Sequence, residues 1–280
     1  MTEELNTKQA TNHSVKAQLT KAMAIIYESF QLTSGLKWPI FKRNILLVLL
    51  TGLTFLVLFY VYLRLIGATY STASFYLNIS MLYILILIQA IIIFKLYIPI
   101  FLMGVKQALG VPVDINLIKY ECSTVKKELF KLVIYYSFIF ATYAFITIYL
   151  NSLFILNILK LVLSLIFMLI FTPICLLSIP LITTEKKSFN LAINIAYNKY
   201  FLNWIPILGS YFIFTIITAT ISITLRAGAL WLAYYIPIIN KVLHLINIIP
   251  SIWLLPMLVI IGGIIYRDIF ILKNYSGKTN

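Results

Sequence analysis

Two polar side chains interrupt an otherwise apolar run of this chain, and they are its best candidates for chemistry. Gln89 and Lys95 lie within the run that extends from Met81 to Met103. Burying an ionisable or strongly polar group in hydrocarbon is costly, so such a group is a functional candidate wherever it occurs. A buried Lys95 ammonium group would attract an anionic solute or a lipid headgroup.

A second interpretation of Lys95 requires no binding site. The aliphatic stem of lysine lets its ammonium group reach the edge of a hydrocarbon layer while the stem stays inside. Pro99 would interrupt the helix nearby, because proline lacks the N–H group that a helix requires. We favour this interpretation, and we expect Lys95→Met to leave folding and insertion intact in either case.

Enzymatic chemistry is not expected from this sequence. His13 and His244 are far apart, which gives neither a metal-ligand cluster nor a histidine base beside a nucleophile. Cys122 and Cys175 imply neither a disulfide framework nor a metal site, and no Gly-rich phosphate loop is present. We therefore predict no enzyme, no metal and no cofactor. All eight acidic residues lie outside the apolar runs, at Glu3, Glu4, Glu28, Asp114, Glu121, Glu128, Glu185 and Asp268.

The composition is that of a membrane protein. Hydrophobic residues make up 62% of the chain and charged residues 11%, whereas about a quarter of the residues in a soluble domain are charged. The net charge of +14 comes from Lys and Arg between apolar runs, as in cytoplasmic loops that face anionic headgroups. We expect membrane lipids as partners, with other membrane proteins as a second class, and no nucleic acid.

Six continuously apolar runs predict six transmembrane helices, since an open sheet would leave backbone groups unpaired in lipid. Runs of about 20 residues match a hydrocarbon thickness of about 30 Å. Most of the 22 Lys and Arg residues fall in alternate connecting segments and at the two ends. The positive-inside rule therefore places both ends in the cytoplasm, as in a bacterial inner-membrane protein. The runs are residues 45–63, 81–103, 132–150, 161–182, 204–225 and 249–266.

Each cytoplasmic segment contains a stretch with apolar residues at helical spacing, which leads into an outward span. The predicted fold is an all-α membrane protein whose six transmembrane helices form three hairpins, each preceded by a cytoplasmic amphipathic helix. Residues 1–43 form the cytoplasmic N-terminus, 44–266 the membrane domain and 267–280 a cytoplasmic tail. The three apolar stripes are Val15, Leu19, Met23, Ile26 and Phe30; Ile115, Ile118, Cys122, Val125 and Leu129; and Phe189, Ala192, Ile193, Ala196 and Tyr200.

Two local features complete the predicted layout. The segment between Pro237 and Pro250 has the pattern of a short interfacial helix on the outer surface. Gly262 and Gly263 would allow another helix to approach closely.

Three short motifs in the second half of the chain carry a resemblance to a known family. They are Ser178-Ile179-Pro180-Leu181-Ile182, then Asn203-Trp204 after an amphipathic stretch, and Tyr266-Arg267-Asp268-Ile269-Phe270 at the end of the last run. The layout resembles the bacterial family of six-span membrane proteins of unknown function typified by YciC. It is also similar to the membrane domain of some glycerophosphodiester phosphodiesterases. The resemblance implies an inner-membrane location and offers no established catalytic residues. We do not expect phosphodiesterase activity, because the sequence has no soluble catalytic stretch that matches the fused domain.

Two functions fit these observations. The first is a non-enzymatic membrane protein that acts on lipids or partner proteins in envelope organisation. Its candidate headgroup ligands are two lysine pairs, Lys126-Lys127 and Lys186-Lys187. The alternative is a transporter or channel for a small neutral or anionic solute. That function needs a polar path, which would use Gln89, Lys95, Thr142, Thr147, Thr172, Ser210, Thr215 and Thr218 unless the hydroxyls bond their own helices.

Overall fold

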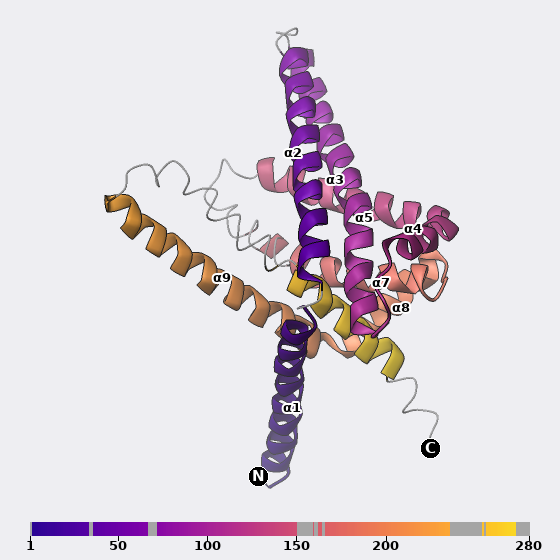
Figure 1. Ribbon diagram of the computed structural model, residues 1–280, viewed down its shortest axis with the longest axis vertical. Helices are drawn as coiled ribbons and strands as arrows, with labels where there is room; N and C mark the ends of the chain where they lie inside the picture. The colour runs from indigo at the N-terminus through magenta and orange to yellow at the C-terminus, as the bar shows by residue number, and fades with distance from the viewer. Residues whose placement is uncertain are drawn as a thin grey trace. The chain divides into compact units, whose positions relative to one another are not determined.

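The computed structural model describes residues 2–33, 36–66, 72–149, 159, 162–163, 166–235, 254 and 256–272. Every regular element in these ranges is a helix (Figure 1). The all-α class predicted from the sequence is therefore confirmed for the described part of the chain.

Four helices are long and apolar enough to cross a membrane. Only 6% of the most apolar window of α2 and 33% of that of α5 are buried inside the protein, so most of these side chains point outward, as they do in lipid. The chain is a helical membrane protein. The four helices are α2 (Lys37–Ile66), α3 (Thr72–Ala108), α5 (Lys126–Tyr149) and α9 (Trp204–Tyr235). Their membrane-crossing stretches are Trp38–Tyr60, Ser80–Ala108, Lys126–Thr147 and Trp204–Trp231.

The other two predicted spans are described only in part. The described end of the fourth consists of a π-helix, η3 (Phe167–Phe171), and α7 (Thr172–Thr183). The described end of the sixth is a helix over residues 256–266 that continues into a second π-helix, η4 (Arg267–Leu272). Six spans and three hairpins therefore remain a prediction. The predicted outer helix between Pro237 and Pro250 lies outside the described residues.

Three further helices each precede a long one. They are α1 (Thr2–Leu32) before α2, α4 (Ile115–Thr124) before α5, and α8 (Phe189–Leu202) before α9. The Asp114 carboxylate begins α4 by accepting the Asn116 N–H at 2.8 Å, which satisfies one of the free donors at a helix start. In η3, the Thr172 N–H reaches back to the carbonyl of Phe167; this wider turn precedes Pro173, which has no N–H group to donate.

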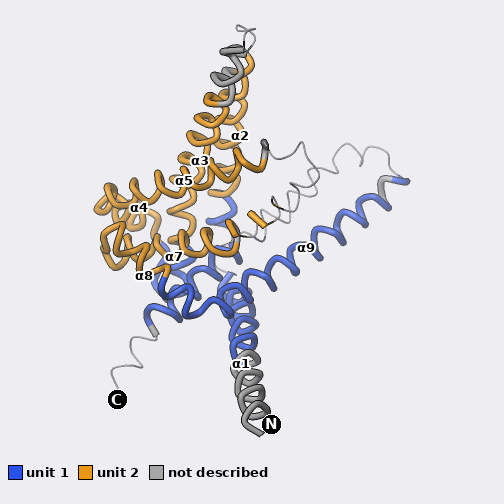
Figure 2. Tube along the Cα trace, turned by 180° about the vertical axis from the view of Figure 1, so that it is seen from behind, with its two compact units in different colours: residues 1–42, 103–113, 198–280 blue, residues 43–102, 114–197 orange. Residues whose placement is uncertain are grey.

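The chain divides into two compact units that do not follow its sequence order (Figure 2). Unit 1 contains residues 1–42, 103–113 and 198–280, and unit 2 contains residues 43–102 and 114–197.

The helix over residues 256–266 supplies much of the core of unit 1. Val259, Ile260 and Ile264 are all fully buried. A Cβ atom on Gly263 would lie 2.5 Å from the carbonyl oxygen of Gly104, so the two backbones touch where both residues lack a side chain. The close helix approach predicted at Gly263 is confirmed.

In unit 1, α1 also packs along α9. Its packed face consists of small and medium side chains, with Ala22 and Ser29 fully buried and Ile25 nearly so. A Cβ atom on Gly209 of α9 would lie 3.1 Å from the Cβ atom of Ala22. The apolar stripe predicted on α1 is largely on another side, because Leu19, Met23 and Phe30 are exposed while Ile26 is buried.

The core of unit 2 forms around α7, whose residues from Pro173 to Thr183 are all buried. Aromatic rings join its neighbours: the Tyr143 and Phe167 rings stack with centroids 4.6 Å apart, and Phe94 of α3 meets Tyr136 of α5. The predicted stripes of α4 and α8 lie inward where they are most closely packed, at Ile118, Leu129, Ala192 and Ala196. Asn190, Asn194 and Asn198 of α8 are exposed.

Candidate functional site

In unit 2, one carboxylate joins the two chain segments that carry the predicted lysine pairs. Glu128, near the start of α5, accepts a hydrogen bond from the Phe189 N–H at the start of α8, at 2.8 Å. Lys126 and Lys127 directly precede Glu128, and Lys186 and Lys187 lie within three residues of Phe189. We call these four lysines the basic surface.

The local backbone explains why the second pair is presented there. The chain leaves α7 through Thr184, whose N–H donates to the Pro180 carbonyl, and the Lys187 N–H donates to the Leu181 carbonyl. Lys186 between them has φ of 53°, a left-handed conformation that a non-glycine residue adopts at a helix end. Lys186 is exposed as a result, and Lys187 is half-buried.

The hydrogen-bond partners of Glu128 are groups other than the four lysines. Its Oε1 atom binds the ammonium group of Lys131 at 2.7 Å, and its Oε2 atom accepts from a backbone donor at the α8 N-terminus. Carboxylates are favoured at helix N-termini, and the Glu128 carboxylate occupies that place at the start of α8. The hydrogen bonds of Glu128 go to Lys131 and Phe189, while Lys127 is near enough for its charge to act on the same carboxylate.

Unit 2 also has exposed aromatic side chains on the helices α4 and α5. Tyr120 of α4 is 66% exposed and Phe130 of α5 is 60% exposed. A membrane interface takes aromatic rings at headgroup depth and cations at the level of the phosphates, so a surface with both kinds of side chain suits it.

Gln89 has a structural role in unit 2. Its amide nitrogen donates to the Thr51 carbonyl at 2.8 Å, and its amide oxygen accepts from the Thr54 hydroxyl at 3.0 Å. Both partners belong to α2, so Gln89 joins α2 to α3 with a reciprocal pair of hydrogen bonds.

Lys95 lies on a different side of α3 from Gln89. Six residues separate it from Gln89, so the two side chains leave α3 about 120° apart. The Lys95 side chain is exposed on the surface of its helix. The structure therefore does not bring the two candidates together.

The hydroxyls proposed for a polar path bond to their own helices. In unit 2, Thr142 donates to Phe138 and Thr147 to Ala144. In unit 1, Ser210 donates to the carbonyl of Pro206 at 2.6 Å. Such bonds are the usual state of a hydroxyl within a helix in lipid. The same holds for the remaining members of the set, Thr172, Thr215 and Thr218.

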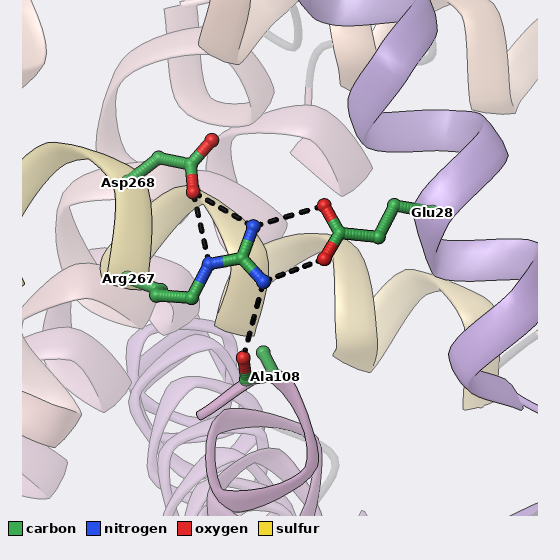
Figure 3. Close-up of polar contacts among 4 residues, drawn as sticks. All are labelled: Glu28, Ala108, Arg267 and Asp268. Atoms are coloured by element: carbon green, nitrogen blue, oxygen red, sulfur yellow. Dashed lines mark hydrogen bonds and ion pairs between the residues drawn. The ribbon is translucent and has the colours of Figure 1, made fainter. Parts of the chain in front are cut away.

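A second polar cluster, in unit 1, centres on Arg267. Figure 3 shows its guanidinium group between the carboxylates of Glu28 and Asp268, with the Ala108 carbonyl on a third side. Two nitrogens pair with the two oxygens of Glu28 at 2.5 Å and 2.9 Å. The Asp268 carboxylate accepts two more hydrogen bonds, at 3.0 Å and 2.9 Å, and the Ala108 carbonyl accepts one at 3.2 Å.

This cluster ties three segments together and leaves Arg267 little capacity for a ligand. Glu28 is on α1, Ala108 ends α3, and Arg267 begins η4. The hydrogen bond to Arg267, and then the positive charge, hold the pKa of Glu28 below its usual value although partial burial opposes this. Hydrogen bonding to Glu28 likewise raises the pKa of Arg267. The cluster is an electrostatic clamp within unit 1.

Sequence reasoning missed the partners in both clusters. Arg267 and Asp268 were noticed as part of a helix ending, but Glu28 is 239 positions away from Arg267 and carries no local signal. The same is true of Glu128, which lies 61 positions from its backbone donor at Phe189. Charge spacing can reveal partners within one helix but not between distant segments.

Metal and thiol chemistry find no support in the described residues. Within those ranges, no group of three or more His, Cys, Asp and Glu side chains could hold a metal ion. Burial, and then the nearby Glu121 carboxylate, raise the pKa of the Cys122 thiol to about 11, so this cysteine is protonated near neutral pH. Cys175 is buried.

Comparisons with protein-family models, with curated proteins and with solved structures give no match to this chain.

Proposed function

We propose that this chain is a non-enzymatic protein of a bacterial inner membrane, whose basic surface holds anionic lipid headgroups. The observation that carries the proposal is the hydrogen bond between Glu128 and Phe189, because it joins the two chain segments that carry the lysine pairs. A role in organising the envelope, through lipids gathered there, fits the resemblance to the YciC-like family.

Electrostatics and exposure support this function. A lysine close to an anionic membrane surface contributes about 1 kcal/mol to the attraction. Lys126, Lys127 and Lys186 are exposed, and the exposed rings of Tyr120 and Phe130 suit the interface that such a surface would meet.

The test compares lipid preference between two variants that lose equal charge. Lys127→Gln with Lys186→Gln removes one lysine from each pair, and Lys21→Gln with Arg226→Gln removes two exposed charges elsewhere. The full chain in neutral detergent is titrated with phosphatidylglycerol and with phosphatidylcholine, and the stabilisation against heat is measured for each lipid.

We expect the wild type and the Lys21/Arg226 variant to prefer phosphatidylglycerol. The Lys127/Lys186 variant should lose most of that preference, by about tenfold or more in apparent affinity at about 1 kcal/mol for each lysine. An equal preference in all three proteins would refute the basic surface as a headgroup site.

A further inference from the structure

The α1 helix has an apolar face that the protein does not cover. Leu19 is 46% exposed, Met23 59%, and Tyr27 and Phe30 68% each. At 3.6 residues per turn, these four side chains fall within an arc of about 80°. Four large apolar side chains on one arc are unusual on a face that meets water.

Two contacts fix the rotation of α1 within unit 1, so this face is held outward. On one side Ala22 packs against Gly209 of α9. On another side, both carboxylate oxygens of Glu28 accept hydrogen bonds from the guanidinium group of Arg267. Glu28 leaves the helix about 145° from the centre of the exposed apolar arc, so the clamp turns Leu19, Met23 and Phe30 away from it.

The packing on α9 also places that face beside the apolar stretch of α9. The membrane-crossing stretch of α9 begins at Trp204, and Gly209 lies five residues further along. At 1.5 Å per residue, the contact with Ala22 is about 7–8 Å past the start of the stretch. Helices that lie in a membrane interface bury their apolar face by about 5–10 Å.

The exposed surface of α9 continues from the same contact. Phe212 is 66% exposed and Ile216 is 50% exposed, and both belong to the stretch that is apolar enough to cross a membrane. Lipid that covers these residues would extend without a break to the outer face of α1. Tyr27 adds a ring with a polar end, which is favoured where hydrocarbon meets headgroups.

The geometry points to α1 as a membrane anchor, with Leu19, Met23, Tyr27 and Phe30 in contact with the acyl chains at the edge of the bilayer. The ligand is the hydrocarbon of the lipid rather than its charge. This inference is independent of the basic surface, because it concerns another unit and requires no anionic headgroup.

Fluorescent labels on α1 test the anchor in neutral membranes. The full chain carrying Cys122→Ser receives one new cysteine, at Met23→Cys or at Phe30→Cys, and is reconstituted in phosphatidylcholine nanodiscs. Lys21→Cys is the matched control, since Lys21 is exposed and points about 165° away from the apolar arc. Each label is then quenched by lipids with a nitroxide on the acyl chain and, separately, by aqueous iodide.

We expect the nitroxide lipid to quench the labels at positions 23 and 30 about threefold more than the label at position 21, with the order reversed for iodide. Equal lipid quenching at the three positions would overturn the anchor. Protection of positions 23 and 30 from both quenchers, with disulfide cross-linking between copies through Met23→Cys, would also overturn it and assign the face to a second copy of the chain. The absence of anionic lipid from these nanodiscs separates the outcome from that of the headgroup proposal.

Discussion

Glu28 and Arg267 are 239 positions apart in the sequence, yet their side chains form a bidentate ion pair with N–O distances of 2.5 Å and 2.9 Å. The pair joins the end of α1 to the start of η4, and the Ala108 carbonyl at the end of α3 accepts a further hydrogen bond from Arg267. The C-terminal half of α1 is thus part of the folded unit.

Removing the charge of Glu28 should destabilise unit 1. Glu28→Gln keeps the size of the side chain but loses the ion pair. Because Glu28 is 36% exposed, we expect a loss of about 1 kcal/mol, between the values for an exposed pair and for a hydrogen bond to a charged group. Thermal unfolding in detergent measures this, with Lys21→Gln on the same helix as the control. Equal unfolding temperatures for wild type and Glu28→Gln would contradict a stabilising role.

The same pair predicts how stability depends on pH. The pKa of Glu28 is lowered in the folded protein, so the unfolded state takes up a proton first as the pH falls. The stabilisation is complete above the ordinary glutamate pKa of about 4.3 and is lost as the pH drops through the lower folded value. We expect the unfolding temperature of the wild type to fall more steeply below about pH 4.5 than that of Glu28→Gln. Parallel curves would assign the acid sensitivity to other groups.

The long helices could be predicted from the sequence because a continuous apolar run of about 20 residues has the length of a helix that crosses a bilayer. The face with which α1 packs could not. Sequence periodicity identified Leu19, Met23 and Phe30 as a stripe, and these side chains are exposed. The packed face depends on Ala22 and Ser29, which are small and give no hydrophobic period, because close packing of helices in membranes favours small residues.

The candidate site was predicted in its parts but not as a whole. The two lysine pairs were recognised from charge alone, whereas their proximity depends on the hydrogen bond between Glu128 and Phe189. A carboxylate that caps a distant helix looks in the sequence like any other charge in a loop. The sequence draws attention to Gln89 as a polar group in a predicted span, but its partners on α2, a threonine hydroxyl and a backbone carbonyl, carry no distinctive sequence signal.

The close contact of two glycines predicts a sharp effect of adding one methyl group. Gly263→Ala would place a Cβ atom 2.5 Å from the carbonyl oxygen of Gly104, and a backbone atom cannot move aside cheaply. We expect a loss of about 1–3 kcal/mol in stability. Gly52→Ala is the matched control, since nothing lies within 4 Å of the added atom, and it should be neutral or stabilising by up to about 1 kcal/mol. Similar unfolding temperatures for the two variants would contradict the contact.

The two candidate side chains of α3, Gln89 and Lys95, should respond differently to replacement. Gln89→Leu loses two hydrogen bonds to α2, which are worth about 0.6 kcal/mol each between helices in membranes. Lys95→Met changes an exposed side chain and should leave the unfolding temperature unchanged. Lipid dependence measured on the same samples adds a second result: a loss of anionic-lipid stabilisation in Lys95→Met would restore Lys95 as a binding residue.

The sidedness of the basic surface can be checked with cysteines placed within it. Lys127→Cys and Lys187→Cys should react with a membrane-impermeant maleimide only after the cells are opened, because the positive-inside rule places these lysines in the cytoplasm. The native thiols should give little background, since Cys175 is buried and the pKa of Cys122 is raised to about 11; a thiol reacts as its thiolate. A cysteine at Arg64, which follows the first predicted span and therefore lies outside in the predicted layout, serves as the positive control in intact cells. Labelling of position 127 or 187 from outside would reverse the assigned orientation, and the basic surface would then face the wrong leaflet for the proposed function.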